Sequence, residues 1–127
     1  MKKLFISCPM KGRTEEDIRK SMEKMHKIAE IIFEQELEVI PTYIEDNPPE
    51  CREQRLWYLG ESIKMMARAD YFVGPYYSSY AGCEVEKMAA ELYEVPRTYV
   101  HIADIAPDLQ RREMLSDAGV MPCFAGE

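Results

Sequence analysis

The sequence predicts a single α/β domain, a doubly wound parallel sheet of four to five strands with helices on both faces. Short apolar segments, partly β-branched, alternate along the chain with longer segments in which apolar residues recur every three or four positions. This alternation is typical of parallel sheets because a helix carries the chain from each strand to the next. The length of 127 residues and the hydrophobic fraction of 46% suit one folded core, so we expect one domain at 1–127.

The first strand is expected at 3–7, and Pro9 and Gly12 mark the loop that ends it. Thr14 is a natural N-cap for the next helix, because its hydroxyl can accept a hydrogen bond from a first-turn N–H group. Three acidic residues follow Thr14, where the helix dipole favours negative charge. The apolar stripe of this helix of about 20 residues consists of Ile18, Met22, Met25, Ala29 and Ile32.

The second strand is expected at 37–43, where Pro41 indicates an edge strand or the end of a strand. A second helix is expected at 53–69; Gly60 weakens it, so this segment forms either one helix or two shorter pieces. The residues expected to face inward on this helix are Leu56, Leu59, Ile63 and Met66.

The third strand is expected at 71–74, the third helix at 82–93 and the fourth strand at 97–102. The tail is expected to be helical at 109–115, and 120–124 is either a short fifth strand or simply a tail. Strands that alternate with helices in this way indicate a flavodoxin-like or Rossmann-like domain.

Composition excludes several classes of protein. The formal net charge is -7, whereas a protein that binds a nucleic-acid polymer carries a basic stripe. A single nucleotide can still be held by a local loop. No apolar run reaches the roughly 20 residues of a membrane span, and no secretory leader is visible, so we expect a cytoplasmic protein. The four cysteines form no C-x-x-C pair and there are two histidines, so the spacing implies no metal and no other cofactor.

In a doubly wound sheet, ligands bind outside the carboxyl ends of the strands, at the switch in strand order. The loop after the first strand lies there, beside a helix N-terminus, and is neither a Walker A loop nor a G-x-G-x-x-G loop. Its backbone N–H groups and two cations suit phosphate or ribose binding; the alternative is a plain turn with solvated charges. The candidate binding residues are Ser7, Pro9, Met10, Lys11, Gly12 and Arg13.

The loop after the third strand carries three tyrosines within five positions, at 76, 77 and 80. Their flat rings suit the walls of a nucleobase site, and the alternative is that they cap the core or contact another subunit. The candidate binding residues here are Tyr76, Ser79, Tyr80 and Gly82.

Two acids of the third helix differ in expected burial. At ~100° per residue, Val85, Ala89 and Leu92 form one apolar stripe, which we expect to be buried. Glu86 then lies at the edge of that stripe, half sheltered, whereas Glu84 lies toward solvent. A carboxylate in the first turns of a helix is stabilised as an anion, which suits a nucleophile. The alternative is an acid in a salt bridge at the edge of the core.

Three stretches of the chain resemble the nucleoside 2-deoxyribosyltransferase family and its small relatives, the 2′-deoxynucleoside 5′-phosphate N-hydrolases. Residues 4–12 match the opening strand and S-x-P-M-x-G loop, and 69–70 match an Ala-Asp pair before an apolar strand. Residues 82–96 match a Gly, a Glu four residues later, an Ala four beyond it and a Pro ten beyond the Glu. The resemblance covers roughly 2–100.

The resemblance implies that Glu86 is the nucleophile that attacks C1′ of a deoxyribose, and that Asp70 serves the same chemistry. The alternative for Asp70 is that it caps or orders the turn between helix and strand. The family Asp expected eight residues before Asp70 is replaced by Ser62, so its neighbour Glu61 becomes the third catalytic candidate. A sugar-binding Ser or Asp of the family is likewise replaced, here by Tyr80.

The resemblance also implies a homodimer or higher homo-oligomer, with Trp57, Tyr58 and the tail after Asp104 as candidate contacts. Three functions remain open. The first is an enzyme that cleaves an N-glycosidic bond or transfers deoxyribose through a glycosyl–Glu86 intermediate. The second is a non-catalytic module that binds or senses a nucleoside or nucleotide on the same fold. The third is a folded, oligomeric scaffold with a vestigial pocket.

Overall fold

The computed structural model describes residues 1–41 and 47–109, and these build one parallel sheet. Its strands are β1 (Lys2–Ile6), β2 (Leu37–Val39), β3 (Tyr71–Pro75) and β4 (Arg97–Val100). They lie in the order β2-β1-β3-β4 and every neighbouring pair is parallel. The α/β class and the flavodoxin-like, doubly wound sheet that the sequence predicts are therefore confirmed.

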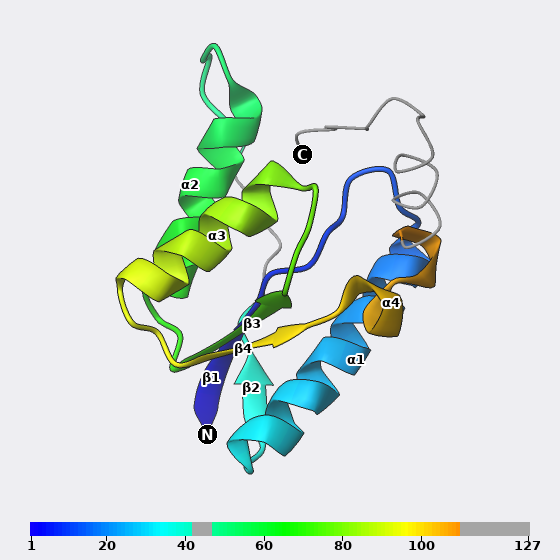
Figure 1. Cartoon of the computed structure of the whole chain (residues 1–127). Helices are drawn as coiled ribbons and strands as arrows, with labels where there is room; N and C mark the ends of the chain where they lie inside the picture. The colour runs from blue at the N-terminus through cyan, green and yellow to red at the C-terminus, as the bar shows by residue number, and fades with distance from the viewer. Residues whose placement is uncertain (42–46, 110–127) are drawn as a thin grey trace.

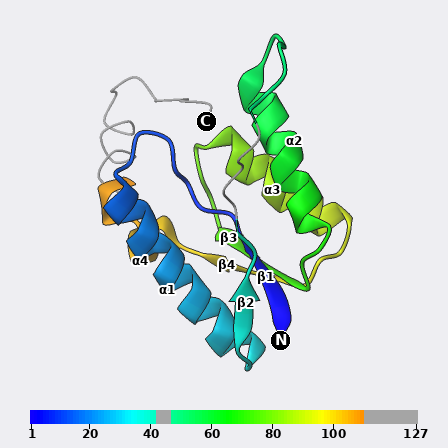
Figure 2. The ribbon, with the colours of Figure 1, turned by 180° about the vertical axis from the view of Figure 1, so that it is seen from behind.

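Helices cover both faces of this sheet (Figures 1 and 2). They are α1 (Glu15–Phe33), α2 (Gln54–Met66), α3 (Ala81–Leu92) and α4 (Ile102–Ile105). Helices α1 and α4 lie together on one face, and α2 and α3 lie together on the other. None of the helices in the described part of the chain is both long and apolar enough to cross a bilayer. The predicted strand at 120–124 and the body of the predicted helix at 109–115 fall outside the described residues.

Helix α1 begins as the sequence predicts. The Thr14 hydroxyl accepts a hydrogen bond from the backbone N–H of Asp17 at 3.1 Å, which confirms the N-cap. The predicted stripe holds through Met25 and Ala29 but fails at Ile32, which is 55% exposed. The reason is that Phe33, not Ile32, turns inward in the last turn and stacks on Tyr71 of β3 at a centroid distance of 4.2 Å.

The remaining boundaries differ from expectation by a few residues. β2 is at the edge of the sheet, in agreement with the Pro41 prediction, and residues 42–46 after it are not described. α2 is one continuous helix through Gly60, and its predicted core residue Leu56 is 64% exposed. β4 ends at Val100 because the chain turns at once into α4.

The buried face of helix α3 is not the one that the sequence predicts. Val85 and Leu92 are 45% and 71% exposed, whereas the buried residues are Cys83, Glu86 and Ala90. Both sets have the spacing of an inward stripe, so periodicity does not separate them. The helix turns its small residues inward, which lets it approach the sheet closely. Glu86 therefore lies on the buried face rather than at its edge.

Side chains along β1 point alternately to the two faces of the sheet, which explains why Ser7, just after β1, contacts α3. Leu4 and Ile6 pack in the core on the α1 side, and Phe5 packs in the core on the α2 and α3 side. Phe5 stacks against Phe72 of β3 at a centroid distance of 5.9 Å. Because side chains two apart along a strand share a face, Ser7 continues the Phe5 side and points toward α3.

A stability prediction follows from the end of α1, where Glu34 adopts a left-handed backbone with φ 56° and ψ 41°. Glycine pays no steric cost there, so Glu34→Gly is expected to raise the free energy of unfolding by about 0.5–1 kcal/mol. Urea unfolding followed by circular dichroism measures it. Glu36→Gly is the matched control, because Glu36 lacks a positive φ and the same change there only adds freedom to the unfolded chain. Equal effects of the two substitutions would contradict the explanation.

Candidate functional site

The candidate site lies where the chain leaves β1 and β3, the central pair of strands. From β1 the chain passes to α1 on one face, and from β3 it passes to α3 on the other, so the two loops diverge. Such a divergence is the switch point at which doubly wound sheets bind ligands. A pocket of about 550 Å³ opens beside it. Its walls come from the end of β1 and the loop after it, from α2 with the residue before it, and from the start of α3. The lining residues are Ile6, Cys8, Met10, Glu53, Arg55, Leu56, Tyr58, Leu59, Ser62, Ala81, Gly82, Cys83, Val85 and Glu86.

A buried hydrogen bond joins the two sides of the switch point. The Ser7 hydroxyl donates to Oε1 of Glu86 at 2.6 Å, across 79 residues of sequence. Ser7 is 1% exposed and Glu86 is 9% exposed. The backbone N–H of Ser7 donates to the Val73 carbonyl at 2.9 Å, which extends the β1–β3 ladder and fixes the serine. The structure thus brings together two of the predicted site residues and holds the carboxylate at the pocket wall.

Gly74 makes room for this arrangement. A Cβ at Gly74 would lie 2.9 Å from two atoms of the Phe72 ring and 3.3 Å from Cβ of Ser7. The first distance is shorter than any normal contact, and the Phe72 ring is fully buried, so it has little freedom to withdraw. The absence of a side chain at Gly74 therefore leaves room for the Phe72 ring and for Ser7.

Cys8 lines the pocket, but its thiol is poorly suited to act as a nucleophile. Burial raises the pKa of Cys8 to about 11, and the charge and hydrogen bond of Arg13 only partly oppose that rise. The thiol is therefore protonated at neutral pH, and a thiolate is the reactive form. Among the pocket residues, Glu86 is the better candidate for covalent chemistry.

Sequence reasoning missed the wall that α2 provides. Arg55, Tyr58, Leu59 and Ser62 follow one another at spacings of three, one and three, so they share one helix face. That spacing is visible in the sequence, but nothing local indicates that this face borders a pocket.

Glu53, the N-cap of α2, also belongs to this wall. It accepts hydrogen bonds from the backbone N–H of Arg55 at 3.2 Å and from its Nε at 2.8 Å. The hydrogen bond from the Arg55 side chain is the main reason why the pKa of Glu53 falls to about 2. Glu53 is therefore ionised at neutral pH.

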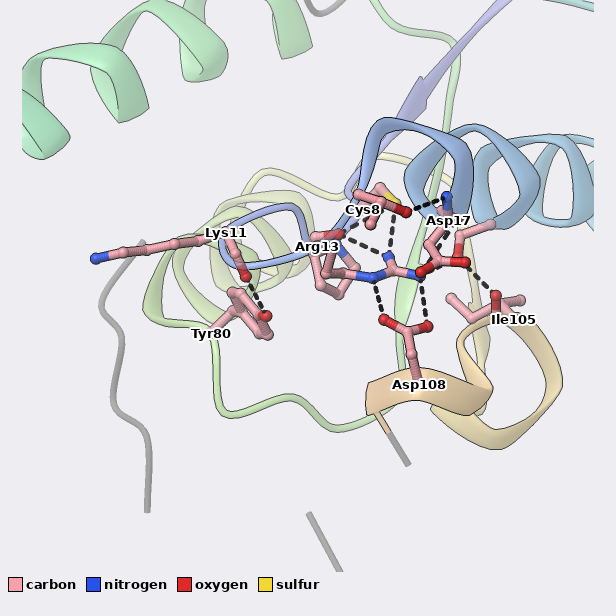
Figure 3. Close-up of polar contacts among 10 residues, drawn as sticks. Cys8, Lys11, Arg13, Asp17, Tyr80, Ile105 and Asp108 are labelled. Atoms are coloured by element: carbon pink, nitrogen blue, oxygen red, sulfur yellow. Dashed lines mark hydrogen bonds and ion pairs between the residues drawn. The ribbon is translucent and has the colours of Figure 1, made fainter. Parts of the chain in front are cut away.

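Arg13 does not supply the pocket-facing cation that the sequence predicts. Its side chain is 1% exposed and its Nε donates to Asp108 at 2.9 Å (Figure 3). Asp108 follows it by 95 residues, so no local pattern indicates the pair. Of the two predicted cations, Lys11 remains exposed on the loop, outside the pocket wall.

The other loop candidates divide between pocket and scaffold. Met10 and Gly82 line the pocket, whereas Pro9, Gly12 and Ser79 do not. Pro9 is buried and its carbonyl accepts a hydrogen bond from Arg13 at 2.8 Å.

The predicted tyrosine wall does not form. Tyr80 is 7% exposed and packs in the core, and its hydroxyl donates to the Lys11 carbonyl at 2.6 Å. Tyr76 is 60% exposed and stacks on His101 at 5.5 Å, beside β4. The aromatic residue in the pocket wall is instead Tyr58 from α2.

The geometry does not support catalytic roles for Asp70 and Glu61. Asp70 precedes β3, so it lies at the amino end of the sheet, opposite the pocket. There its Oδ2 accepts a hydrogen bond from the Lys3 N–H at 2.8 Å, which orders the turn. Glu61 pairs with Lys64 on the surface of α2, and its neighbour Ser62 faces the pocket.

No three metal-binding side chains converge anywhere in residues 1–41 and 47–109.

Comparison with models of protein families, with curated proteins and with solved structures finds no match to this chain. The candidate site therefore stands on its own geometry: a buried carboxylate, a hydroxyl that orients it, and a largely apolar pocket at the switch point.

A second prediction concerns Gly74. Gly74→Ala is expected to lower the free energy of unfolding by about 1–3 kcal/mol, because the added methyl group must displace Phe72 or Ser7. Denaturant unfolding measures the change. Gly60→Ala is the matched control, because nothing lies within 4 Å of the added Cβ in α2. That variant is expected to be as stable as the parent or more so by up to about 1 kcal/mol. A Gly74→Ala variant with parental stability would contradict the close approach.

Proposed function

We propose that this protein cleaves the N-glycosidic bond of a deoxynucleoside or deoxynucleotide, or transfers its deoxyribosyl group, in the cytoplasm. The observation that carries the proposal is the Glu86 carboxylate, buried at the wall of the switch-point pocket and held by the Ser7 hydroxyl at 2.6 Å. The family that residues 4–12 and 82–96 resemble has its nucleophilic Glu at the position of Glu86. Geometry and resemblance therefore favour the same residue.

The reaction is a double displacement at C1′ of the sugar. A carboxylate oxygen of Glu86 forms a bond to C1′ as the C1′–N bond breaks, and the base leaves with the bonding electrons through an oxocarbenium-like transition state. Water or a second base then attacks C1′ and releases the Glu86 carboxylate, with net retention of configuration. The first base needs a proton as it leaves, and the acceptor gives one up as it attacks.

The pocket residues have matching tasks in this proposal. The Ser7 hydroxyl fixes one carboxylate oxygen of Glu86, so that the carboxylate keeps one orientation toward the sugar. Tyr58 offers a flat aromatic face, and Met10 and Leu56 offer apolar surface, for the base. The loop 8–13 borders the end at which a 5′-hydroxyl or 5′-phosphate would bind.

The second candidate is a nucleoside- or nucleotide-sensing module without chemistry, and one observation favours it. Besides Glu86, the residues that line the described pocket include one other carboxylate, Glu53. Its pKa of about 2 means that it carries no proton at neutral pH that it could donate to the departing base. Ser62 lies in the pocket wall where the resembled family has an Asp. A sensing module would be stabilised by its ligand and would release no base.

The third prediction tests the nucleophile. Purified protein is incubated with a panel of deoxynucleosides and their 5′-monophosphates, with and without a free acceptor base, and the products are separated by chromatography. Glu86→Gln is expected to lower kcat by about 10³-fold or more, because the amide cannot form the glycosyl ester. Glu84→Gln is the matched control on the same helix, since Glu84 pairs with Lys87 and does not line the pocket.

Base exchange that requires the acceptor would identify a transferase, and base release from the substrate alone would identify a hydrolase. Parental turnover by a folded Glu86→Gln variant would disprove the role of Glu86. Thermal stabilisation by panel members without any base release would favour the sensing module instead.

The exposed apolar stripe of α3 supports the proposal of a homo-oligomer. Val85, Met88 and Leu92 are spaced by three and four residues and are 45%, 59% and 71% exposed. An apolar stripe of this kind is typical of a subunit contact. Val85 also lines the pocket, so a second copy on this stripe would border the site.

The fourth prediction follows from that stripe. The parent is expected to elute as a dimer or larger in size-exclusion chromatography with light scattering, and Met88→Asp is expected to shift it toward the monomer because it buries a charge in the contact. Ile31→Asp, which alters a 70% exposed residue of α1, is the matched control and should leave the assembly unchanged. A monomeric parent would disprove the contact.

A further inference from the structure

The loop 8–13 forms one wall of the pocket, and its backbone carbonyls are held from two directions. The Pro9 carbonyl accepts a hydrogen bond from Nη1 of Arg13 at 2.8 Å. The Lys11 carbonyl accepts one from the Tyr80 hydroxyl at 2.6 Å (Figure 3). One of these two contacts therefore depends on where the Arg13 guanidinium lies.

The pocket is sensitive to this loop because Cys8 and Met10 both line it. Met10 also accepts a hydrogen bond at its carbonyl from the Arg13 N–H, at 3.1 Å, which closes a turn. A shift of the loop would therefore move two side chains of the pocket wall. Ser7 and Glu86 would keep their positions, because the β1–β3 ladder and α3 hold them.

Asp108 holds the guanidinium at two points. Its carboxylate accepts from Nε of Arg13 at 2.9 Å and from Nη2 at 3.1 Å, a two-point contact that fixes both position and plane. Burial alone would raise the pKa of Asp108, but the hydrogen bond and charge of Arg13 outweigh it and hold the pKa below its ordinary value. Asp108 is therefore ionised at neutral pH.

Helix α1 and the end of α4 complete this cluster. Nη2 of Arg13 also donates to the Ser21 hydroxyl at 2.7 Å, and that hydroxyl donates to the Ile105 carbonyl at 2.6 Å. The Arg13 side chain is 1% exposed and that of Asp108 is 35% exposed. The cation is thus buried, and its counter-charge comes from the segment after α4.

We propose that Asp108 is a positioning residue for the pocket, which sets the conformation of the loop 8–13 through Arg13. Neither Arg13 nor Asp108 lines the pocket, so both act at a distance. Without Asp108 the buried guanidinium, which stays charged, loses its counter-charge, and turning toward solvent relieves that cost. The same movement releases the Pro9 carbonyl and so removes one of the two restraints on the loop, while Tyr80 still holds the Lys11 carbonyl. The kind of ligand that the loop contacts rests on the proposed function, but the coupling itself does not.

The fifth prediction tests this coupling with a readout that needs no activity. Hydrogen–deuterium exchange of the full chain is followed by mass spectrometry in Asp108→Ala, Asp108→Glu and Asp104→Ala. Exchange in the loop 8–13 is expected to rise about tenfold in Asp108→Ala, with exchange in α3 unchanged. Asp108→Glu restores the charge and should restore part of the protection. Asp104→Ala removes an exposed carboxylate of α4 and should match the parent.

Kinetics of the same variants separate positioning from general damage. With the best substrate of the panel, Asp108→Ala is expected to raise KM by roughly 10- to 100-fold while kcat stays within about threefold, because the loop moves and the Ser7–Glu86 pair does not. Parental loop exchange in Asp108→Ala, an unchanged KM, or exchange that rises equally in the loop and α3 would each overturn the proposal. If the parent turns over no substrate, the proposed function fails, and the loop exchange alone decides the role of Asp108.

Discussion

The hydrogen bond between Ser7 and Glu86 is the constraint on which the rest of the site depends. A carboxylate withdrawn from water is costly unless other donors replace the lost hydration, and a 2.6 Å hydrogen bond from a buried hydroxyl supplies part of that replacement. The donor comes from the end of β1 and the acceptor from α3, so both elements must be placed correctly at once. Gly74 makes this possible because it leaves room beside Ser7.

The orientation of α3 follows from the same constraint. Cys83 and Ala90, which flank Glu86 on the inward face, are small and buried. With small residues at the contact, the helix backbone lies near the sheet and Glu86 can reach Ser7. The larger apolar residues Met88 and Leu92 then face outward, at 59% and 71% exposure. The helix thus gives up part of its hydrophobic burial to place one polar side chain, and the surface it leaves exposed is where we place the subunit contact.

The sequence predicts the parts of this structure that have local causes. Capping chemistry predicts the Thr14 cap, and Pro41 indicates the edge position of β2. Parallel topology brings Ser7 and Glu86 to one edge of the sheet. Asp70 orders the turn before β3, which is one of the two roles that its position predicts, because a residue that precedes a strand lies at the amino end of the sheet. The local sequence does not determine which face of α3 is buried, since two sets of residues both have the spacing of a helix face. The Arg13–Asp108 pair joins residues 95 apart, and only the folded chain brings them together.

That distant pair changes how the charges around the pocket are interpreted. Lys11 and Arg13 are the two cations that the sequence offers to an anion, but Arg13 contacts Asp108 at 2.9 Å. Arg55, which lines the pocket, likewise contacts Glu53 at 2.8 Å. A cation that is already paired with a carboxylate stabilises a bound anionic ligand less than an unpaired, solvated cation would. The walls that remain are largely apolar, with one aromatic ring, so we expect a ligand to be bound mainly through packing and hydrogen bonds. A charged ligand group at this end of the pocket would then meet the loop 8–13, whose conformation is held in part by Arg13.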